Sequence, residues 1–215
     1  MLHNASLITH WSDLVADIGN ISTDRILHDP QPGTATIDDA VRMNNQGHKC
    51  ELVDGTLVEK AMGWQESLIA AVLIEMLGGF ARTQNLGVVV GADGFIELFP
   101  SLVRAPDVAY FSWDRLPNNR IPMAPIPAIV PDLAIEVLSI GNTRAEMARK
   151  MREYFHAGVR QVWMVDLRER TVAVYTSTTH VQVFACDAKL TATDILPGLE
   201  VDLAVVFAEL DRQRP

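Results

Sequence analysis

The order of the periodic segments constrains the fold of this chain more than any other feature. Apolar residues recur at three- and four-residue spacing over residues 64–83, which predicts a long helix. Extended apolar runs follow, then a second helix that begins near Thr143 and ends at Gly158, then more extended runs. Helices that interrupt a series of strands predict a mixed α/β fold, in which a central mixed β-sheet is flanked by helices.

Turn residues bound the expected strands. Asp54-Gly55 separates two β-prone runs and predicts a type I′ hairpin. Two longer runs each open with a Pro-Asp pair, and a proline-rich loop separates them. The run at 171–176 can pair with the run before it or with the run after it. The expected strands are residues 50–53, 56–59, 86–90, 95–99, 106–111, 131–138, 161–166, 171–176 and 181–186.

Length and composition fit one folded domain. The chain has 215 residues, of which 48% are hydrophobic and 21% charged, so it can bury a sizeable core. Residues 1–33 have mixed polarity and end in the breaker cluster Asp-Pro-Gln-Pro-Gly. We therefore expect an N-terminal extension over 1–33 and a single domain over 34–215. Within that domain, Thr36 begins a helix that ends near Asn45, and residues 203–210 form a closing helix.

Cysteine usage and charge limit the compartment and the partners. Cys50 and Cys186 have no metal-ligand spacing, and neither a secretory signal nor a long apolar run is present. We therefore expect a cytoplasmic protein without a membrane partner. The net charge of −9 argues against broad binding to a phosphate backbone, although a local basic rim stays open. The candidates for such a rim are Arg82, Arg104, Arg115, Arg120, Arg144, Arg149, Arg152 and Arg160.

Glu136 is the most informative polar residue, because apolar residues flank it on both sides in its run. A buried, ionised carboxylate needs a cation, hydrogen-bond donors or a metal. An edge strand with Glu136 facing water is the alternative. Asp107 opens the preceding long run, where an aspartate is also common as a turn residue. Asp132 has the same setting but lies about 13 Å from Glu136 along the strand, too far to share a metal ion directly.

Lys150 is the third candidate, because it lies along the apolar stripe of the second helix. It could also extend to solvent or pair with Glu146 one turn away. If the two strands are adjacent and the helix folds back, Asp107, Glu136 and Lys150 converge. Two carboxylates about 4 Å apart repel by roughly 4 kcal/mol at an effective dielectric of about 20, and a hard divalent ion removes that repulsion. The lysine could then orient or deprotonate a water, or balance charge on a phosphate.

Four segments carry a resemblance to a known family: residues 51–55, 105–109, 135–139 and 150–166. In their order and spacing, the chain resembles the Uma-type restriction endonuclease-like family, a branch of the PD-(D/E)XK nuclease-like superfamily. The resemblance covers residues 36–203. It implies a restriction-endonuclease-like fold and a metal-dependent endonuclease that hydrolyses phosphodiester bonds in DNA.

The resemblance also implies roles for particular residues. Asp107 and Glu136 match the ligands of a magnesium or manganese ion. The superfamily's lysine lies two residues after the glutamate, where this chain has Leu138, and Lys150 matches its displaced position in this branch.

Three further residues and two properties of the whole protein follow from the same resemblance. Gln65 best matches a polar active-site residue at the start of the first long helix, with Glu66 as the runner-up, and Glu51 matches a further acid. A homodimer is expected. The main alternative is a non-catalytic binding or assembly module that keeps the nuclease fold, which the net charge of −9 favours.

Overall fold

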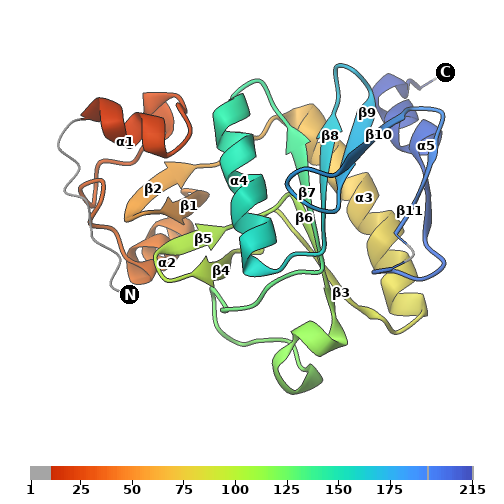
Figure 1. Cartoon of the computed structure of the whole chain (residues 1–215), viewed down its shortest axis with the longest axis horizontal. Coiled ribbons are helices and arrows are strands. Elements are labelled where there is room, and N and C mark those ends of the chain that lie inside the picture. Colours follow the sequence, from red (N-terminus) through yellow and green to blue (C-terminus); the bar gives the residue numbers. More distant parts are fainter. Residues whose placement is uncertain (1–10, 193, 215) are drawn as a thin grey trace.

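The computed structural model describes residues 11–192 and 194–214, and its largest unit is a six-stranded sheet (Figure 1). The strand order is β10-β9-β8-β7-β6-β3. Strands β7 and β8 are parallel and every other neighbouring pair is antiparallel, which confirms the predicted mixed sheet. The strands are β3 (Gly87–Gly91), β6 (Val108–Ser112), β7 (Leu133–Leu138), β8 (Gln161–Asp166), β9 (Thr171–Tyr175) and β10 (Val181–Ala185).

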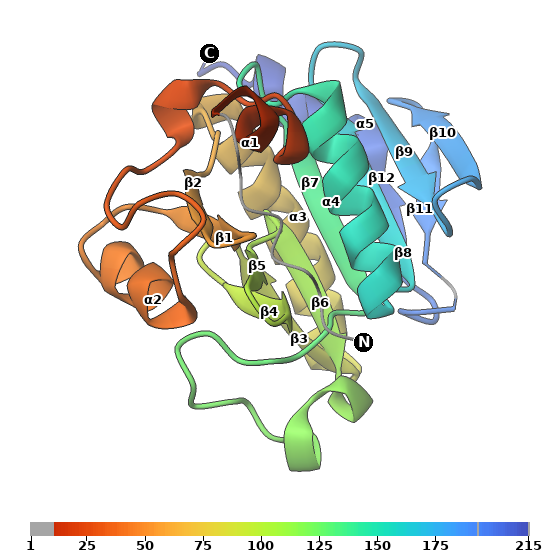
Figure 2. The same cartoon turned by 60° about the vertical axis from the view of Figure 1, so that its left-hand side comes forward.

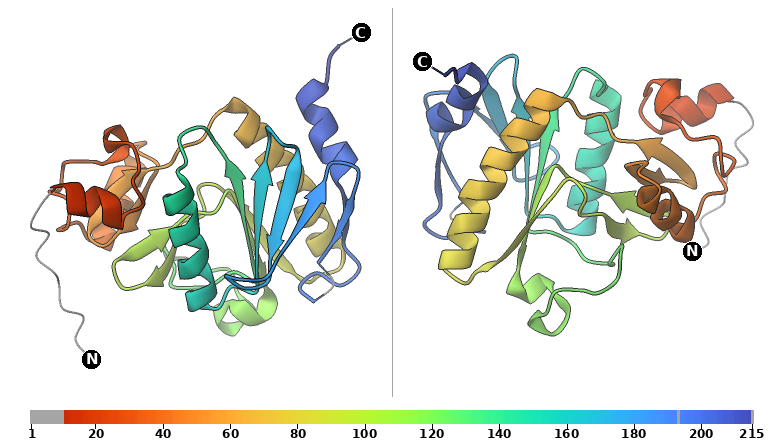
Figure 3. Two further views of the ribbon diagram at one scale, coloured as in Figure 1. Left: turned by 45° about the horizontal axis from the view of Figure 1, so that its top comes forward. Right: turned by 180° about the vertical axis from the view of Figure 1, so that it is seen from behind.

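One long helix covers each face of this sheet. Helix α3 (Trp64–Thr83) lies across one face and α4 (Arg144–Ala157) across the other (Figures 2 and 3). Side chains alternate along β7, so that Leu133, Ile135 and Val137 enter the same apolar cluster as α3. Ala134 enters the cluster that holds Tyr154 of α4, and Glu136 shares that face of the strand. The helices thus place Glu136 beneath α4.

Both ends of α4 follow from local chemistry. Thr143 accepts a hydrogen bond from the backbone N–H of Glu146, and the Glu146 side chain returns to the N–H of Thr143. Gly158 ends the helix in the left-handed region, with a φ of 95°. The predicted helix boundaries are confirmed.

A smaller sheet lies beside the first, with the order β2-β1-β5-β4. Asp54 and Gly55 both have positive φ, 49° and 73°, as a type I′ hairpin requires. Asn44, in the last turn of α2, exchanges two hydrogen bonds with the backbone of Cys50 and so fixes that helix against β1. The elements are α2 (Ile37–Asn45), β1 (Cys50–Val53), β2 (Thr56–Glu59), β4 (Ile96–Phe99) and β5 (Leu102–Arg104).

The C-terminal part adds a two-stranded ladder of β11 (Lys189–Thr191) and β12 (Glu200–Asp202). The closing helix is present as α5 (Leu203–Ala208), followed by a 3-10 turn, and both pack on α3. Strands β5, β11 and β12 were not predicted, because three residues carry too little periodicity. The proline-rich loop contains the 3-10 turns η2 (Trp113–Arg115) and η3 (Pro117–Asn119).

Residues 11–33 lie against the smaller sheet and α4. They contain α1 (Trp11–Asp17) and the 3-10 turn η1 (Thr23–Arg25), and Ile26 forms a β-bridge with Val58. Four of their apolar side chains enter the cluster beneath α4, namely Leu14, Ile18, Ile21 and Ile26. The domain boundary at residue 33 stays a prediction, and residues 1–10 of the expected extension lie outside the described residues.

Two further expectations concern cysteines and membranes. Cys50 and Cys186 are both free thiols, Cys50 buried and Cys186 exposed. Among the described helices, α3 alone is long and apolar enough to cross a membrane. It packs against β3, β6, β7 and α5, which is the position of a core helix.

Candidate active site

The register of the central sheet places Asp107 beside Glu136. Strands β6 and β7 pair antiparallel, with Val108 opposite Ile135. Continuing that register by one residue puts Asp107 opposite Glu136 on the same face of the sheet. Oδ2 of Asp107 accepts a hydrogen bond of 2.8 Å from the backbone N–H of Val137. The two predicted carboxylates therefore meet at one edge of β7.

Glu136 is buried in the middle of the sheet, so the edge-strand interpretation is wrong. The Lys150 ammonium lies 3.3 and 3.2 Å from its two oxygens, and the Tyr154 hydroxyl donates to Oε1 at 2.5 Å. Burial raises the pKa of Glu136, and the nearby charges of Asp107 and Glu51 act in the same direction, against Lys150. The surroundings of Glu136 thus disfavour the ionised form of its carboxylate.

Lys150 is buried between two carboxylates and does not extend to solvent. Its ammonium lies 3.1 Å from Oε1 of Glu51 and 3.2 Å from Oε2 of Glu136. Burial would lower the pKa of this lysine, but Glu136 and Glu51 outweigh burial and raise it above the usual value. The alternative pairing of Lys150 with Glu146 is not found among the described ion pairs, because Glu146 accepts two hydrogen bonds from Arg25 instead.

Glu51 joins the smaller sheet to the site. Its Oε2 lies 2.7 Å from the Arg104 guanidinium, and its Oε1 also accepts from the backbone N–H of Ala105. Burial alone would raise the pKa of Glu51, but Lys150 and Arg104 hold it well below the usual range. Arg104 also pairs with Glu153 of α4. It is therefore an internal counter-ion, and its assignment to a basic rim is wrong.

Lys60 is the residue that sequence reasoning missed. Its ammonium lies 3.0 Å from Oδ1 of Asp107 and donates to the carbonyl oxygens of Ala105 and Ala92 at 2.6 and 3.3 Å. Lys60 directly follows β2, and the predicted end of that strand was the only sequence signal near this lysine. Asp107 lies 47 residues further along the chain. No spacing rule connects residues that far apart.

Gln65 is not brought into this cluster. It is exposed in the first turn of α3, and no hydrogen bond or ion pair among the described residues joins it to Asp107, Glu136 or Lys150. The runner-up, Glu66, lies against Gly63 in the same turn. Its catalytic role and that of Gln65 stay predictions.

Asp132 lies apart from the other acids. One of its oxygens accepts from the backbone N–H of Ser112 at 2.9 Å, and the other lies 3.0 Å from the Arg115 guanidinium. The similar setting of Asp107 in the sequence leads to a different partner set, because Lys60 reaches Asp107 and arginines reach Asp132.

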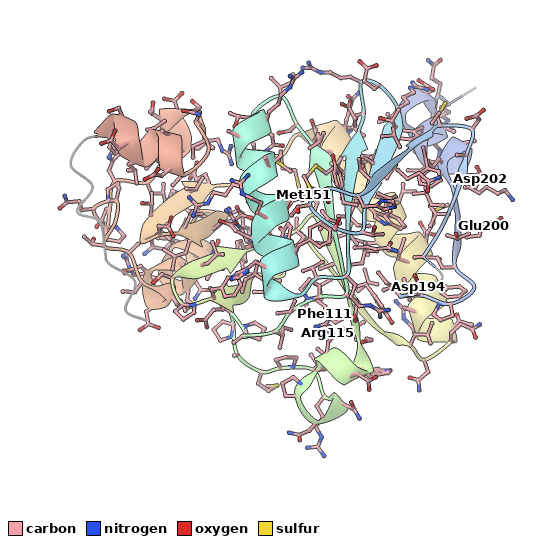
Figure 4. All side chains as sticks on the ribbon, viewed as in Figure 1. Phe111, Arg115, Met151, Asp194, Glu200 and Asp202 are labelled. Carbon is pink, nitrogen blue, oxygen red and sulfur yellow. The ribbon has the colours of Figure 1, made fainter. Side chains whose placement is uncertain are left out.

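Several of the expected rim arginines are engaged within the protein. Arg149 pairs with Glu153 and Asp54, and Arg115 pairs with Asp132. The expected rim arginines that are exposed are Arg82, Arg120, Arg144, Arg152 and Arg160. Part of the acidic excess lies away from α4, since Asp194, Glu200 and Asp202 project from the C-terminal part of the molecule (Figure 4). These three acids contribute to the net charge of −9 from outside the site.

The site sets three buried carboxylates, Glu51, Asp107 and Glu136, against three cations whose side chains are at most 6% exposed. The cations are Lys60, Arg104 and Lys150. Among the described residues, no group of three or more histidines, cysteines or acids is arranged to hold a metal ion. Magnesium needs only one or two protein carboxylates because it retains several waters, and Asp107 and Glu136 are the acids that could supply them.

Comparisons with known proteins agree with the fold. The model of the Uma2 family, described as "Putative restriction endonuclease", matches residues 37–205. The chain is also similar to the crystal structure of a putative nuclease belonging to DUF820 from Anabaena variabilis ATCC 29413. That match has a TM-score of 0.70 and 23% sequence identity, and covers 81% of this chain and 98% of the other. No curated protein matches the chain significantly.

Proposed function

Because the chain belongs to the Uma2 family of restriction-endonuclease-like nucleases, we propose that it hydrolyses phosphodiester bonds in DNA with a magnesium or manganese ion. Asp107 and Glu136 would hold the ion and Lys150 would assist the reaction. The observation that carries the proposal is the register of β6 and β7, which brings these two acids together beneath α4. Lys150 then lies 3.2 Å from Glu136 although 14 residues separate them.

The donor set fits a hard divalent cation. Carboxylate oxygens are the ligands that magnesium and manganese prefer. The charges of Asp107 and Glu51 both raise the pKa of Glu136, so added positive charge would stabilise its ionised form. When bound, the metal ion would polarise the scissile phosphate and lower the pKa of a bound water.

The protein side chains would position the reacting groups. Lys150 keeps its proton at Nζ, because Glu136 and Glu51 raise its pKa, so we favour charge stabilisation of the phosphate over proton abstraction. The Tyr154 hydroxyl fixes one oxygen of Glu136. The backbone N–H of Val137 fixes one oxygen of Asp107. Both acids are thereby held in one orientation before substrate arrives.

Substrate access requires movement. Asp107, Lys150 and Glu136 are only 3%, 3% and 4% exposed. A phosphodiester can reach them only after neighbouring side chains move, so we expect slow cleavage relative to an open site.

The test is DNA cleavage by the full chain with magnesium, with manganese and with chelator. We expect a divalent-dependent cut that falls by about two orders of magnitude or more in Asp107→Asn and Glu136→Gln. Asp211→Asn, which removes an exposed carboxylate paired with Arg170, is the matched control and should cleave like the wild type. Cleavage that persists in both active-site variants would assign the activity to another site or a contaminant.

The non-catalytic alternative makes a different prediction. The supporting observations are the net charge of −9 and the engagement of Arg104, Arg115 and Arg149 in internal ion pairs. A binding module would retain DNA in a mobility-shift assay but leave it intact with either metal. Loss of cleavage in Asp107→Asn with retained binding would decide for catalysis.

A further inference from the structure

Lys60 occupies a cation position that no motif in the sequence marks. Its ammonium is surrounded by three oxygens, from the Asp107 carboxylate at 3.0 Å and the carbonyls of Ala105 and Ala92 at 2.6 and 3.3 Å. The side chains of Lys60 and Asp107 are only 6% and 5% exposed. Carboxylate and carbonyl oxygens are also the ligands of hard metal ions. The protein therefore places its own positive charge where a metal ion would bind these oxygens.

Both oxygens of Asp107 are already engaged. Oδ2 accepts from the backbone N–H of Val137, and Oδ1 faces Lys60. The backbone donor is fixed by the sheet, whereas Lys60 stands on a flexible side chain. Lys60 also begins a segment without helix or strand that leads to α3. Of the two groups bound to Asp107, Lys60 is the one that can withdraw.

We propose that Lys60 is a resident cation that competes with the divalent ion for Asp107, so that the metal binds only when the Lys60 ammonium withdraws. This inference rests on the proposed function, since it assigns Asp107 to the metal. Lys60 is then a positioning residue: its ammonium orients the Asp107 carboxylate in the metal-free protein. It also sets how tightly the metal binds, because two cations at one carboxylate oxygen repel each other.

Lys150 has a different place in the cluster. It contacts Glu136 and Glu51. Within the part of the chain that the structure describes, no hydrogen bond or ion pair joins it to Asp107. The two lysines thus neutralise different carboxylates. Only Lys60 is predicted to limit metal access to Asp107.

The test measures manganese binding to the full chain without DNA. Isothermal calorimetry gives the affinity, and electron paramagnetic resonance detects the free ion. We expect Lys60→Met to bind manganese about tenfold more tightly or better than the wild type, because one opposing charge is removed at contact distance. Lys189→Met is the matched control, since Lys189 pairs with Glu200 on the surface, and its affinity should be unchanged. A purely structural role for Lys60 would weaken binding instead.

Two further variants complete the test. Asp107→Asn should weaken manganese binding, and the double variant Lys60→Met with Asp107→Asn should bind like Asp107→Asn alone. If Lys60→Met does not fold by circular dichroism, Lys60→Gln is used, which removes the charge, keeps a donor for the Ala105 carbonyl and should also tighten binding.

The outcomes separate the two proposals. Unchanged or weaker binding in the neutral Lys60 variant, with loss of binding in Asp107→Asn, overturns the role of Lys60 and leaves the metal site standing. If neither the wild type nor the Lys60 variant binds manganese, the metal site itself fails, and the competition fails with it.

Discussion

Replacing Glu51 with glutamine is expected to lower the free energy of unfolding by about 3 kcal/mol at neutral pH. Glu51 is a fully buried carboxylate that faces two cations, Arg104 at 2.7 Å and Lys150 at 3.1 Å. Glutamine has nearly the same shape, so the substitution removes charge without opening a cavity. The glutamine amide nitrogen is also a hydrogen-bond donor. It would face either Arg104 or Lys150, which are donors too, so one hydrogen bond would be lost.

The magnitude follows from the partners that remain. Removing one member of a buried ion pair costs roughly 3 to 5 kcal/mol when the other charge is left alone. Here Arg104 keeps Glu153 and Lys150 keeps Glu136, so neither cation is left wholly uncompensated. The expected loss therefore lies at the lower end of that range.

Urea denaturation followed by circular dichroism, at several pH values, measures this effect. Glu51 has a pKa below its ordinary value of 4.5 in the folded protein. Its contribution is thus complete above that value and is lost as the pH falls toward the folded-state pKa. The difference between wild type and variant should be largest near neutral pH and shrink below 4.5.

The exposed pair of Asp211 and Arg170 supplies the comparison. Asp211→Asn should leave the denaturation midpoint unchanged. If Glu51→Gln is equally silent, or if its effect grows in acid, the argument that Glu51 neutralises two buried cations is refuted.

Three shorter predictions test other parts of the molecule. Gly158→Ala should lower the free energy of unfolding by about 1 kcal/mol in urea denaturation, because Gly158 has a φ of 95°, which alanine adopts only with backbone strain. An added Cβ would meet no atom within 4 Å, so no steric clash contributes. An unchanged free energy of unfolding would exclude backbone strain there. Val183 is 63% exposed on β10, an edge strand of the six-stranded sheet, so we expect homodimers through this edge and a monomer for Val183→Lys in light scattering. A monomeric wild type at working concentration would contradict it. Trp64, 87% exposed at the start of α3, should stack on unpaired bases, so Trp64→Ala should weaken anisotropy-monitored binding of single-stranded DNA about fivefold or more, at an unchanged melting temperature. Equal affinities would contradict a role for Trp64 in DNA binding.

The parts of the fold that depend on local chemistry were predictable from the sequence. Thr143, Glu146 and Gly158 define the two ends of α4, and Asp54-Gly55 defines the hairpin between β1 and β2. Each signal involves residues a few positions apart, whose backbone preferences do not depend on the rest of the chain.

The partners within the site were only partly predictable. The convergence of Asp107 and Glu136 follows once two strands are assumed adjacent, and that assumption was correct. Lys60 and Asp107 are 47 residues apart, and Arg25 and Glu146 are 121 apart, so no periodicity relates them. Two oppositely charged residues in a sequence do not reveal which carboxylate each cation will meet.

Arg25 has a consequence for how the protein can be divided. Its guanidinium donates to the carbonyls of Glu59 and Gly141 and to both oxygens of Glu146, which ties β2, the loop after β7 and α4 together. The family match begins only at residue 37. A chain shortened to that match would lose these contacts and uncover apolar surface next to α4, so we expect the matched segment alone to be less stable than the full chain.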